Sequence, residues 1–130
     1  MLLVEDDREA SEMMQLVLAD RGARVRIAQD YDSALAALQM AWPDVLVSDI
    51  GLPGRDGYEL VRRVREMERS RPGASRLPVI ALTAFARPED RTKTLAAGFD
   101  LHLGKPLRPH LLLEAIARCR DPAGMAGGAT

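Results

Sequence analysis

The sequence predicts an α/β fold in which five parallel strands form a doubly wound sheet with helices on both faces. Short apolar runs alternate five times with longer segments of helical period, which is the pattern of strands joined by helical crossovers. The third and fourth runs are nearly uninterrupted in apolar character, as expected for strands covered on both faces. The chain has 130 residues, of which 47% are hydrophobic, and this is enough for one compact domain with a packed core.

The first half of the chain predicts two strand and helix pairs. The first strand spans 2–4, and the helix after it ends near Gly22, at a position that favours a left-handed glycine. The second strand spans 25–28, and the second helix ends at Trp42-Pro43-Asp44, because the residue before a proline avoids helical geometry. The residues that recur at helical spacing are Ala10, Met13, Met14, Val17 and Leu18 in the first helix, and Ala34, Leu35, Leu38 and Ala41 in the second.

The second half predicts three more strands, over 45–48, 79–82 and 101–103. A polar, proline-bearing connector over 70–78 separates the third helix from the fourth strand. Pro88 and Pro109 each suit the first position of a helix, and the fourth helix, over 89–97, has only a weak apolar stripe. The apolar stripes are Leu60, Val61, Val64 and Met67 in the third helix, and Leu112, Leu113, Ile116 and Cys119 in the fifth. We expect one domain over 1–120 and a flexible tail or linker over 121–130, which has no periodicity.

The composition argues against several classes of protein. Eighteen Lys and Arg balance 19 Asp and Glu, so the basic excess typical of a nucleic-acid binder is absent. No apolar run approaches the length of a membrane span, and the start of the chain does not resemble a signal peptide. Cys119 is the only cysteine, so no internal disulfide can form, and we expect a buried or half-buried helix residue without redox function in a cytoplasmic protein.

Chemically active side chains gather at the carboxyl ends of the predicted strands, where doubly wound folds place their sites. Carboxylates brought close together repel one another unless a cation lies between them, and an all-oxygen ligand set suits Mg²⁺. The sequence therefore predicts a magnesium site assisted by one lysine. The residues concerned are Glu5, Asp6 and Asp7 after the first strand, Asp49 after the third, Thr83 after the fourth and Lys105 after the fifth.

Four sequence blocks on this pattern resemble the receiver domain of bacterial two-component response regulators. They are Val4-Glu5-Asp6-Asp7, then Ser48-Asp49-Ile50-Gly51-Leu52-Pro53 with Gly57, then Ala81-Leu82-Thr83-Ala84, and finally Lys105-Pro106. The resemblance runs from the first residues to about Arg120. It implies a flavodoxin-like sheet with strand order 2-1-3-4-5.

The resemblance also implies that Asp49 is a phosphoacceptor. Its phosphoryl group would come from a phosphohistidine on a sensor histidine kinase or a phosphotransfer protein, and the domain itself would promote both the transfer and the later hydrolysis. Mg²⁺ would be held by Glu5, Asp6, Asp49 and the backbone carbonyl of Gly51, because a cation must offset the repulsion between carboxylate and phosphoryl group. Asp7 matches no required position, and we expect it to stabilise the N-terminus of the first helix.

The remaining family positions imply a switch. Lys105 would pair with Asp49 and then with a phosphoryl oxygen, and its bond to Pro106 is usually cis in the family. Thr83 would hydrogen-bond the phosphoryl group and move inward. His102 stands where relatives usually have Tyr or Phe, so it is a candidate switch residue, and a histidine without a special role is the alternative. Ala84 is small and Gly51 has no side chain, so we expect a phosphorylated state of intermediate lifetime. The output surface is expected over 84–102, for a downstream protein target.

Other classes fit the sequence less well. An aspartate-nucleophile phosphatase or mutase would carry a second Asp at the position of Gly51, a nucleotide hydrolase would need a phosphate-binding glycine loop, and a flavin site would be repelled by the acids after the first strand. A receiver-like interaction module without phosphorylation is the remaining alternative. The residues at 48–54 and 98–103 resemble those of hybrid-kinase receivers, and the chain starts close to the acidic pair Glu5 and Asp6. Both observations favour the receiver of a hybrid sensor kinase over a single-domain regulator. We expect no contact with nucleic acid or membrane.

Overall fold

The computed structural model describes residues 1–71, 73, 76–84 and 88–120, and it confirms five strand and helix pairs. The tail expected over 121–130 lies outside the described residues. Each predicted strand agrees with the structure to within one residue at either end. The elements are β1 Leu2–Val4, α1 Arg8–Asp20, β2 Arg26–Ala28, α2 Tyr31–Met40, β3 Leu46–Asp49, α3 Gly57–Arg69, β4 Val79–Thr83, α4 Pro88–Ala97, β5 Leu101–Gly104 and α5 Pro109–Arg120.

The five strands form one parallel sheet in the order β2-β1-β3-β4-β5. The chain therefore starts in the middle of the sheet, builds outward to β2, and then crosses over to build the other side. Because β1 and β3 are neighbours, the residues after β1 and at the end of β3 come together. This is the topological switch point at which ligands bind in doubly wound folds.

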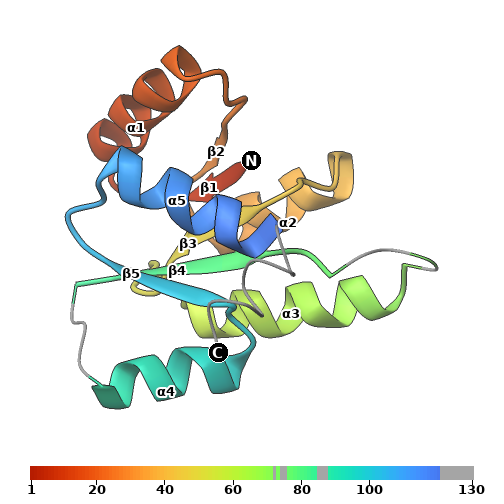
Figure 1. Cartoon of the computed structure of the whole chain (residues 1–130). Helices are drawn as coiled ribbons and strands as arrows, with labels where there is room; N and C mark the ends of the chain where they lie inside the picture. The colour runs from red at the N-terminus through yellow and green to blue at the C-terminus, as the bar shows by residue number, and fades with distance from the viewer. Residues whose placement is uncertain (72, 74–75, 85–87, 121–130) are drawn as a thin grey trace.

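Helices cover the sheet on both faces, with α1 and α5 on one side and α2 and α3 on the other (Figure 1). Successive strand residues alternate between two cores. Leu2, Val4 and Leu46 pack against α2 and α3, whereas Leu3 and Val47 pack against α1 and α5. All five are at most 1% exposed, so β1 and β3 are buried on both faces, and for β3 this confirms the prediction from its nearly uninterrupted apolar sequence.

The helix ends confirm several sequence signals. Gly22 follows α1 with a φ of 87°, in the left-handed region that glycine adopts freely. Pro88 and Pro109 are the first residues of their helices, as predicted. Asp30 caps α2, since its side chain accepts a hydrogen bond from the backbone N–H of Ser33.

The helical stripes are confirmed in part. In α1 the buried residues are Ser11, Met14 and Leu18, whereas Met13 is 67% exposed and Ala10 is also exposed, so the predicted stripe was wrong at its first two positions. The physical reason is that the buried face of α1 is narrow, and Ser11 enters it by donating its hydroxyl to the carbonyl of Arg8. In α2 the predicted Ala41 is exposed as well, because the helix ends before it.

The fourth helix packs weakly, in line with its weak stripe. Thr94 is its one fully buried residue among those described. None of the helices that the structure describes has the length and apolar character needed to cross a bilayer.

Candidate functional site

Four predicted site residues meet at the carboxyl edge of the sheet. Glu5 follows β1, Asp49 ends β3, Thr83 ends β4 and Lys105 follows β5. Parallel pairing brings these ends together, and the backbone N–H of Lys105 donates to the carbonyl of Thr83 at 2.8 Å. The sheet itself therefore positions the site.

Lys105 joins the two buried carboxylates. Its Nζ contacts Asp49 Oδ2 and lies 3.2 Å from Glu5 Oε2 and 3.4 Å from Glu5 Oε1. The carboxylate side chains are 7% and 8% exposed, whereas the lysine is 31% exposed and reaches in from the rim. One ammonium group thus faces two carboxylates, which leaves the site with an excess of negative charge.

The site shifts the proton affinity of its members. Burial and the neighbouring Asp49 raise the pKa of Glu5 from 4.5 to about 7, against the opposing effect of Lys105. Burial lowers the pKa of Lys105. Hydrogen bonds and charge from Asp49 and Glu5 together raise this pKa by more than burial lowers it, so the net shift is upward. Lys105 therefore remains charged at neutral pH, while the folded site holds a proton on Glu5 more tightly than an ordinary glutamate does.

A cation would relieve the excess negative charge. Glu5, Asp6 and Asp49 each present an oxygen, and these atoms all lie within 4.8 Å of one another. Glu5 Oε2 is buried and has the ion pair with Lys105 as its polar contact, and Asp6 is exposed at the mouth of the site. An all-oxygen set open to water on one side suits a hard divalent ion such as Mg²⁺. The predicted acidic cluster is therefore present in the structure.

The loop after β3 shapes the acceptor. Asp49 Oδ1 accepts a hydrogen bond from the backbone N–H of Gly51 at 3.1 Å, and Gly57 N–H donates to the carbonyl of Ile50 at 2.8 Å. A Cβ on Gly57 would lie 2.5 Å from the Asp49 carbonyl oxygen and 2.8 Å from Ile50 Cα. Glycine at position 57 thus lets α3 start directly against the acceptor strand. The residue types alone did not predict the hydrogen bond from Gly51 or the close approach at Gly57.

Two smaller expectations are confirmed. Asp7 is the N-cap of α1, since its Oδ1 accepts from the backbone N–H of Ala10 at 3.1 Å, so it serves the helix. The peptide bond between Lys105 and Pro106 is cis.

Beside the acceptor lies a cavity of about 530 Å³ between α1 and the loop after β5. Thr83 is 9% exposed at its edge of the sheet, whereas Ala84 is exposed and lines the cavity. Apolar residues form much of its wall, including Met13 and Leu107. Met13, whose exposure the sequence did not predict, thus lies at the rim of the site.

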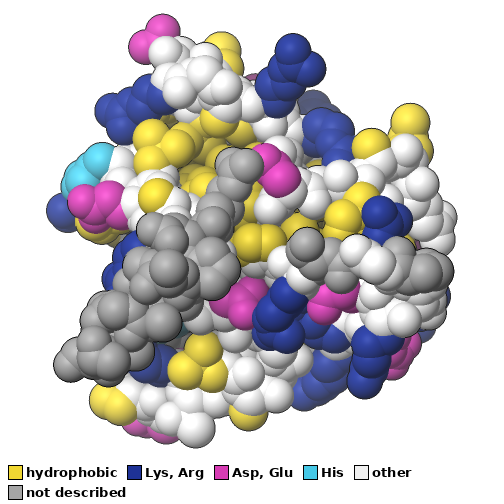
Figure 2. Space-filling model, turned by 45° about the vertical axis from the view of Figure 1, so that its right-hand side comes forward, with side chains coloured by type: hydrophobic (Ala, Val, Ile, Leu, Met, Phe, Trp, Pro, Cys, Tyr) yellow, Lys and Arg dark blue, Asp and Glu magenta, His cyan; other side chains and the backbone are white. Residues whose placement is uncertain are grey.

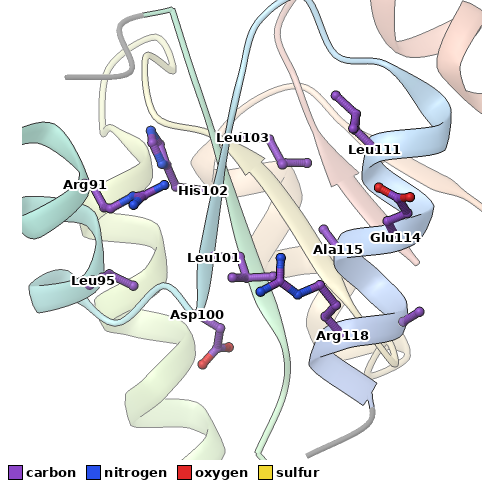
Figure 3. A pocket seen from close by; sticks show the side chains of 11 residues that line it. Arg91, Leu95, Asp100, Leu101, His102, Leu103, Leu111, Glu114, Ala115 and Arg118 are labelled. Carbon is purple, nitrogen blue, oxygen red and sulfur yellow. The ribbon is translucent and has the colours of Figure 1, made fainter. Parts of the chain in front are cut away.

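A second hollow of about 860 Å³ crosses β5 between α4 and α5 (Figure 3). Leu101 and Leu103 point toward α5, and His102 points the other way, toward Arg91 of α4. Both ring nitrogens of His102 are buried and have no hydrogen-bond partner. Burial and the charge of Arg91 lower its pKa, so the ring is neutral at pH 7, against a weaker opposing effect of Asp90. We call this hollow the β5 groove. The part of the expected output surface over 85–87 lies outside the described residues.

Comparison with known proteins gives a consistent result. The family model described as "Response regulator receiver domain" matches residues 1–117. An uncharacterized 14.6 kDa protein of Leptolyngbya boryana is 42% identical over 115 residues, which are 88% of this chain and 85% of that protein. The phosphate regulon transcriptional regulatory protein PhoB of Escherichia coli is 36% identical over 115 residues, which cover 88% of this chain and 48% of PhoB.

Longer proteins and solved structures also match. The hybrid signal transduction histidine kinase D of Dictyostelium discoideum is 36% identical over 110 residues, or 82% of this chain and 7% of the kinase. The chain thus spans about half the length of PhoB and a small part of that kinase. The solved chemotaxis response regulator CheY4 of Vibrio cholerae is 33% identical, with a TM-score of 0.80, and the match covers 91% of this chain and 95% of that one.

Proposed function

The chain belongs to the response regulator receiver domain family, and on that premise we propose that Asp49 accepts a phosphoryl group from a phosphohistidine. The observation that carries the proposal is the contact of Lys105 with a buried Asp49 beside two further carboxylates. A buried, paired carboxylate at the switch point of the sheet has the position of an acceptor. As a receiver domain, the chain serves two-component signalling with a histidine kinase or phosphotransfer protein as its partner.

The transfer is a displacement at phosphorus. A carboxylate oxygen of Asp49 forms a bond to the phosphorus atom, and the bond from phosphorus to the imidazole nitrogen of the donor breaks. The electron pair of that bond stays on the donor imidazole, which takes up a proton from water, and an acyl phosphate forms on Asp49. Lys105 offsets charge on the attacking carboxylate before transfer and on a phosphoryl oxygen afterwards, so catalysis consists of positioning and electrostatics.

Glu5, Asp6, Asp49 and the carbonyl of Gly51 would hold Mg²⁺. This assignment is supported by the clustered carboxylate oxygens and by the buried Glu5 Oε2 without a hydrogen bond. When bound, the ion neutralises charge that repels the incoming phosphoryl group. The hydrogen bond from Gly51 N–H to Asp49 Oδ1 orients the acceptor, leaving Oδ2 toward Lys105.

The donor reaches Asp49 past the rim formed by Met13, Ala84 and Leu107. The apolar part of this wall suits contact with a protein that carries the phosphohistidine. Ala84 and Gly51 place no bulky side chain near the acceptor, so water has access to the acyl phosphate and hydrolyses it.

We further propose that phosphorylation alters the β5 groove. Thr83 lies at the end of β4, beside β5 and before α4. Its movement toward a phosphoryl oxygen would therefore shift the position of α4. His102 is placed to respond, since its unpartnered ring nitrogens do not fix its orientation. The apolar floor and charged walls of the groove suit a downstream protein target (Figure 3).

The wider context is also part of the proposal. We favour the receiver segment of a hybrid sensor kinase. This is supported by the match to a hybrid kinase and by the residues at 48–54 and 98–103, which resemble those of hybrid-kinase receivers. A single-domain regulator is the alternative, and the matches of similar length favour it. We place the domain in the cytoplasm, in keeping with its single cysteine, and assign it no contact with nucleic acid or membrane.

Incubation with acetyl phosphate and Mg²⁺ tests the assignment. Phosphoprotein gels are expected to show phosphorylation of the wild type, none with the chelator EDTA, and none for Asp49→Asn. Asp7→Asn is the matched control, because Asp7 caps a helix and should label like the wild type. Equal labelling of wild type and Asp49→Asn would refute the acceptor. A folded wild type that never labels would favour a receiver-like interaction module without phosphorylation.

A further inference from the structure

The second helix presents an uncharged surface to solvent. From Ser33 to Pro43 the sequence contains no charged residue, although this stretch includes exposed positions. Met40 is 87% exposed, which is the largest value among the exposed large hydrophobic residues. A surface helix normally carries charged side chains on its outer face, so this face of α2 is suited to contact with another molecule.

Trp42 extends this apolar surface at the end of α2. It is half-buried and lines two hollows. One, of about 330 Å³, lies between α2 and α3 and has Leu38 and Met67 in its wall. The other, of about 830 Å³, lies at the amino-terminal edge of the sheet. A single indole ring therefore connects two depressions on one side of the molecule.

The charged side chains around Trp42 are nearly all arginines. The hollow between α2 and α3 is lined by Arg63 and Arg71, and the guanidinium of Arg71 lies 4.4 Å above the Trp42 ring. The other hollow is lined by Arg21, Arg24 and Arg26.

Only one carboxylate, Asp44, lines either hollow among the described residues, and it already makes an ion pair. Figure 2 shows Lys and Arg side chains, in dark blue, and hydrophobic patches, in yellow, spread over one face of the molecule, with Asp and Glu side chains among them. In a chain of net charge −1, the basic and apolar lining of the two hollows contrasts with the acidic edge that carries Glu5 and Asp49.

We propose that this area, defined as Met40, Trp42, Arg24, Arg63 and Arg71 and called the Trp42 surface, binds an acidic amphipathic segment of a partner protein. Apolar side chains of the segment would cover Met40 and Trp42, and its carboxylates would pair with the arginines on either side. A nucleic acid would satisfy the arginines but would leave Met40 exposed. An acidic protein segment accounts for both features.

The Trp42 surface is separate from the phosphorylation site. It involves the C-terminal ends of α2 and α3 and the loops before β2 and β3, at the edge of the sheet opposite Asp49. A partner bound there would leave Asp49 and the β5 groove open. The surface therefore suits a contact that persists while the domain is phosphorylated and dephosphorylated.

Trp42 is the only tryptophan in the chain, so its fluorescence emission reports binding at the Trp42 surface. The probe is a synthetic amphipathic helix with Leu on one face and Glu on the other, carrying a fluorophore for anisotropy. A peptide with Lys in place of every Glu is the control. We expect the acidic peptide to bind at about 50 mM salt with a dissociation constant below about 1 mM, to change the Trp42 emission, and to weaken at higher salt. The basic peptide should not bind.

Variants separate the charged and apolar contributions. The double variant Arg24→Glu with Arg71→Glu should bind the acidic peptide at least tenfold more weakly, and Met40→Ser should bind it several-fold more weakly. All three side chains are exposed, so the fold should be retained. Arg62→Glu with Arg108→Glu makes the same change in charge at two exposed positions that line neither hollow, and this control should stay within twofold of the wild type.

Several outcomes would overturn the proposal. These are no binding of the acidic peptide up to millimolar concentration, an equal loss of binding with the Arg62→Glu and Arg108→Glu control, or unchanged binding with the Arg24→Glu and Arg71→Glu variant. Tighter binding of duplex DNA than of the acidic peptide would assign the surface to nucleic acid instead. Self-association that is lost on Met40→Ser, seen by sedimentation, would assign it to a second copy of the chain.

Discussion

The proton affinity of Glu5 predicts an unusual dependence of stability on pH. Its pKa rises from 4.5 to about 7 on folding, because the side chain is buried and lies beside Asp49. Between these values the folded chain holds a proton that the unfolded chain has released. The stability that this proton contributes is therefore fully present below pH 4.5 and is lost as pH rises through 7.

The size of this effect follows from the shift. A difference of 2.5 pKa units, at 1.36 kcal/mol for each unit, gives a loss of about 3 kcal/mol of unfolding free energy between pH 4.5 and pH 8.

Urea denaturation in EDTA, followed by circular dichroism at several pH values, measures the loss. Glu5→Gln cannot ionise, so the difference in unfolding free energy between wild type and variant should change by about 2–3 kcal/mol across this range. Added Mg²⁺ should reduce the change, because a metal favours the ionised carboxylate. A parallel pH dependence in wild type and Glu5→Gln, without metal, would refute the account of the site as a cluster of carboxylates with excess negative charge.

Three further predictions concern packing and charge. Gly57→Ala should lower the unfolding free energy by about 3 kcal/mol in urea, since its Cβ meets rigid backbone, whereas Gly51→Ala should change it by less than about 0.5 kcal/mol. Arg65→Ala should cost about 3 kcal/mol, because it strips buried carbonyls and carboxylates of their donor, and Arg63→Ala, in an exposed pair, less than about 0.5 kcal/mol. The unfolding free energy of the wild type, relative to that of a His102→Phe variant, should fall as pH drops below 6.5, because the folded chain takes up the histidine proton less readily than the unfolded chain. The same dependence of unfolding free energy on pH in both proteins would show that the ring is not buried in solution.

The geometry of the site was predictable because it depends on topology. Glu5, Asp49, Thr83 and Lys105 each lie at or directly after a strand end, and parallel strands bring those ends to one edge. The residue types could be read at those positions without knowing any distance. The clustering of Glu5, Asp6 and Asp49 follows from the same rule, and their oxygens do lie together.

The sequence did not predict the contacts that depend on which face of a helix a residue occupies. Arg65 looks like any other arginine of α3, yet its side chain is 12% exposed and pairs with Glu68 and Asp100. It also donates to the carbonyls of Leu77 and Gly98, and so ties α3 to the starts of β4 and β5. Its position next to Val64 on the inner face is a weak signal, since long polar side chains at such positions more often turn back to solvent.

The exposure of Met13 was missed for a related reason. A methionine at helical spacing predicts a core residue, and only the packed structure shows that Ser11 takes the inner position while Met13 lines the cavity beside Asp49. The second helix likewise has a single covered face. Apolar residues beyond that face, such as Met40, are exposed.

The most direct test of the central claim identifies the residue that carries the phosphoryl group. Reduction of an aspartyl phosphate with borohydride converts that aspartate to homoserine, and peptide mass spectrometry locates it in the sequence. After treatment with acetyl phosphate and Mg²⁺, we predict homoserine at position 49 and unmodified aspartate at positions 6 and 7. Homoserine at another position, or none in a protein that has taken up phosphate, would contradict the assignment of Asp49 as the acceptor.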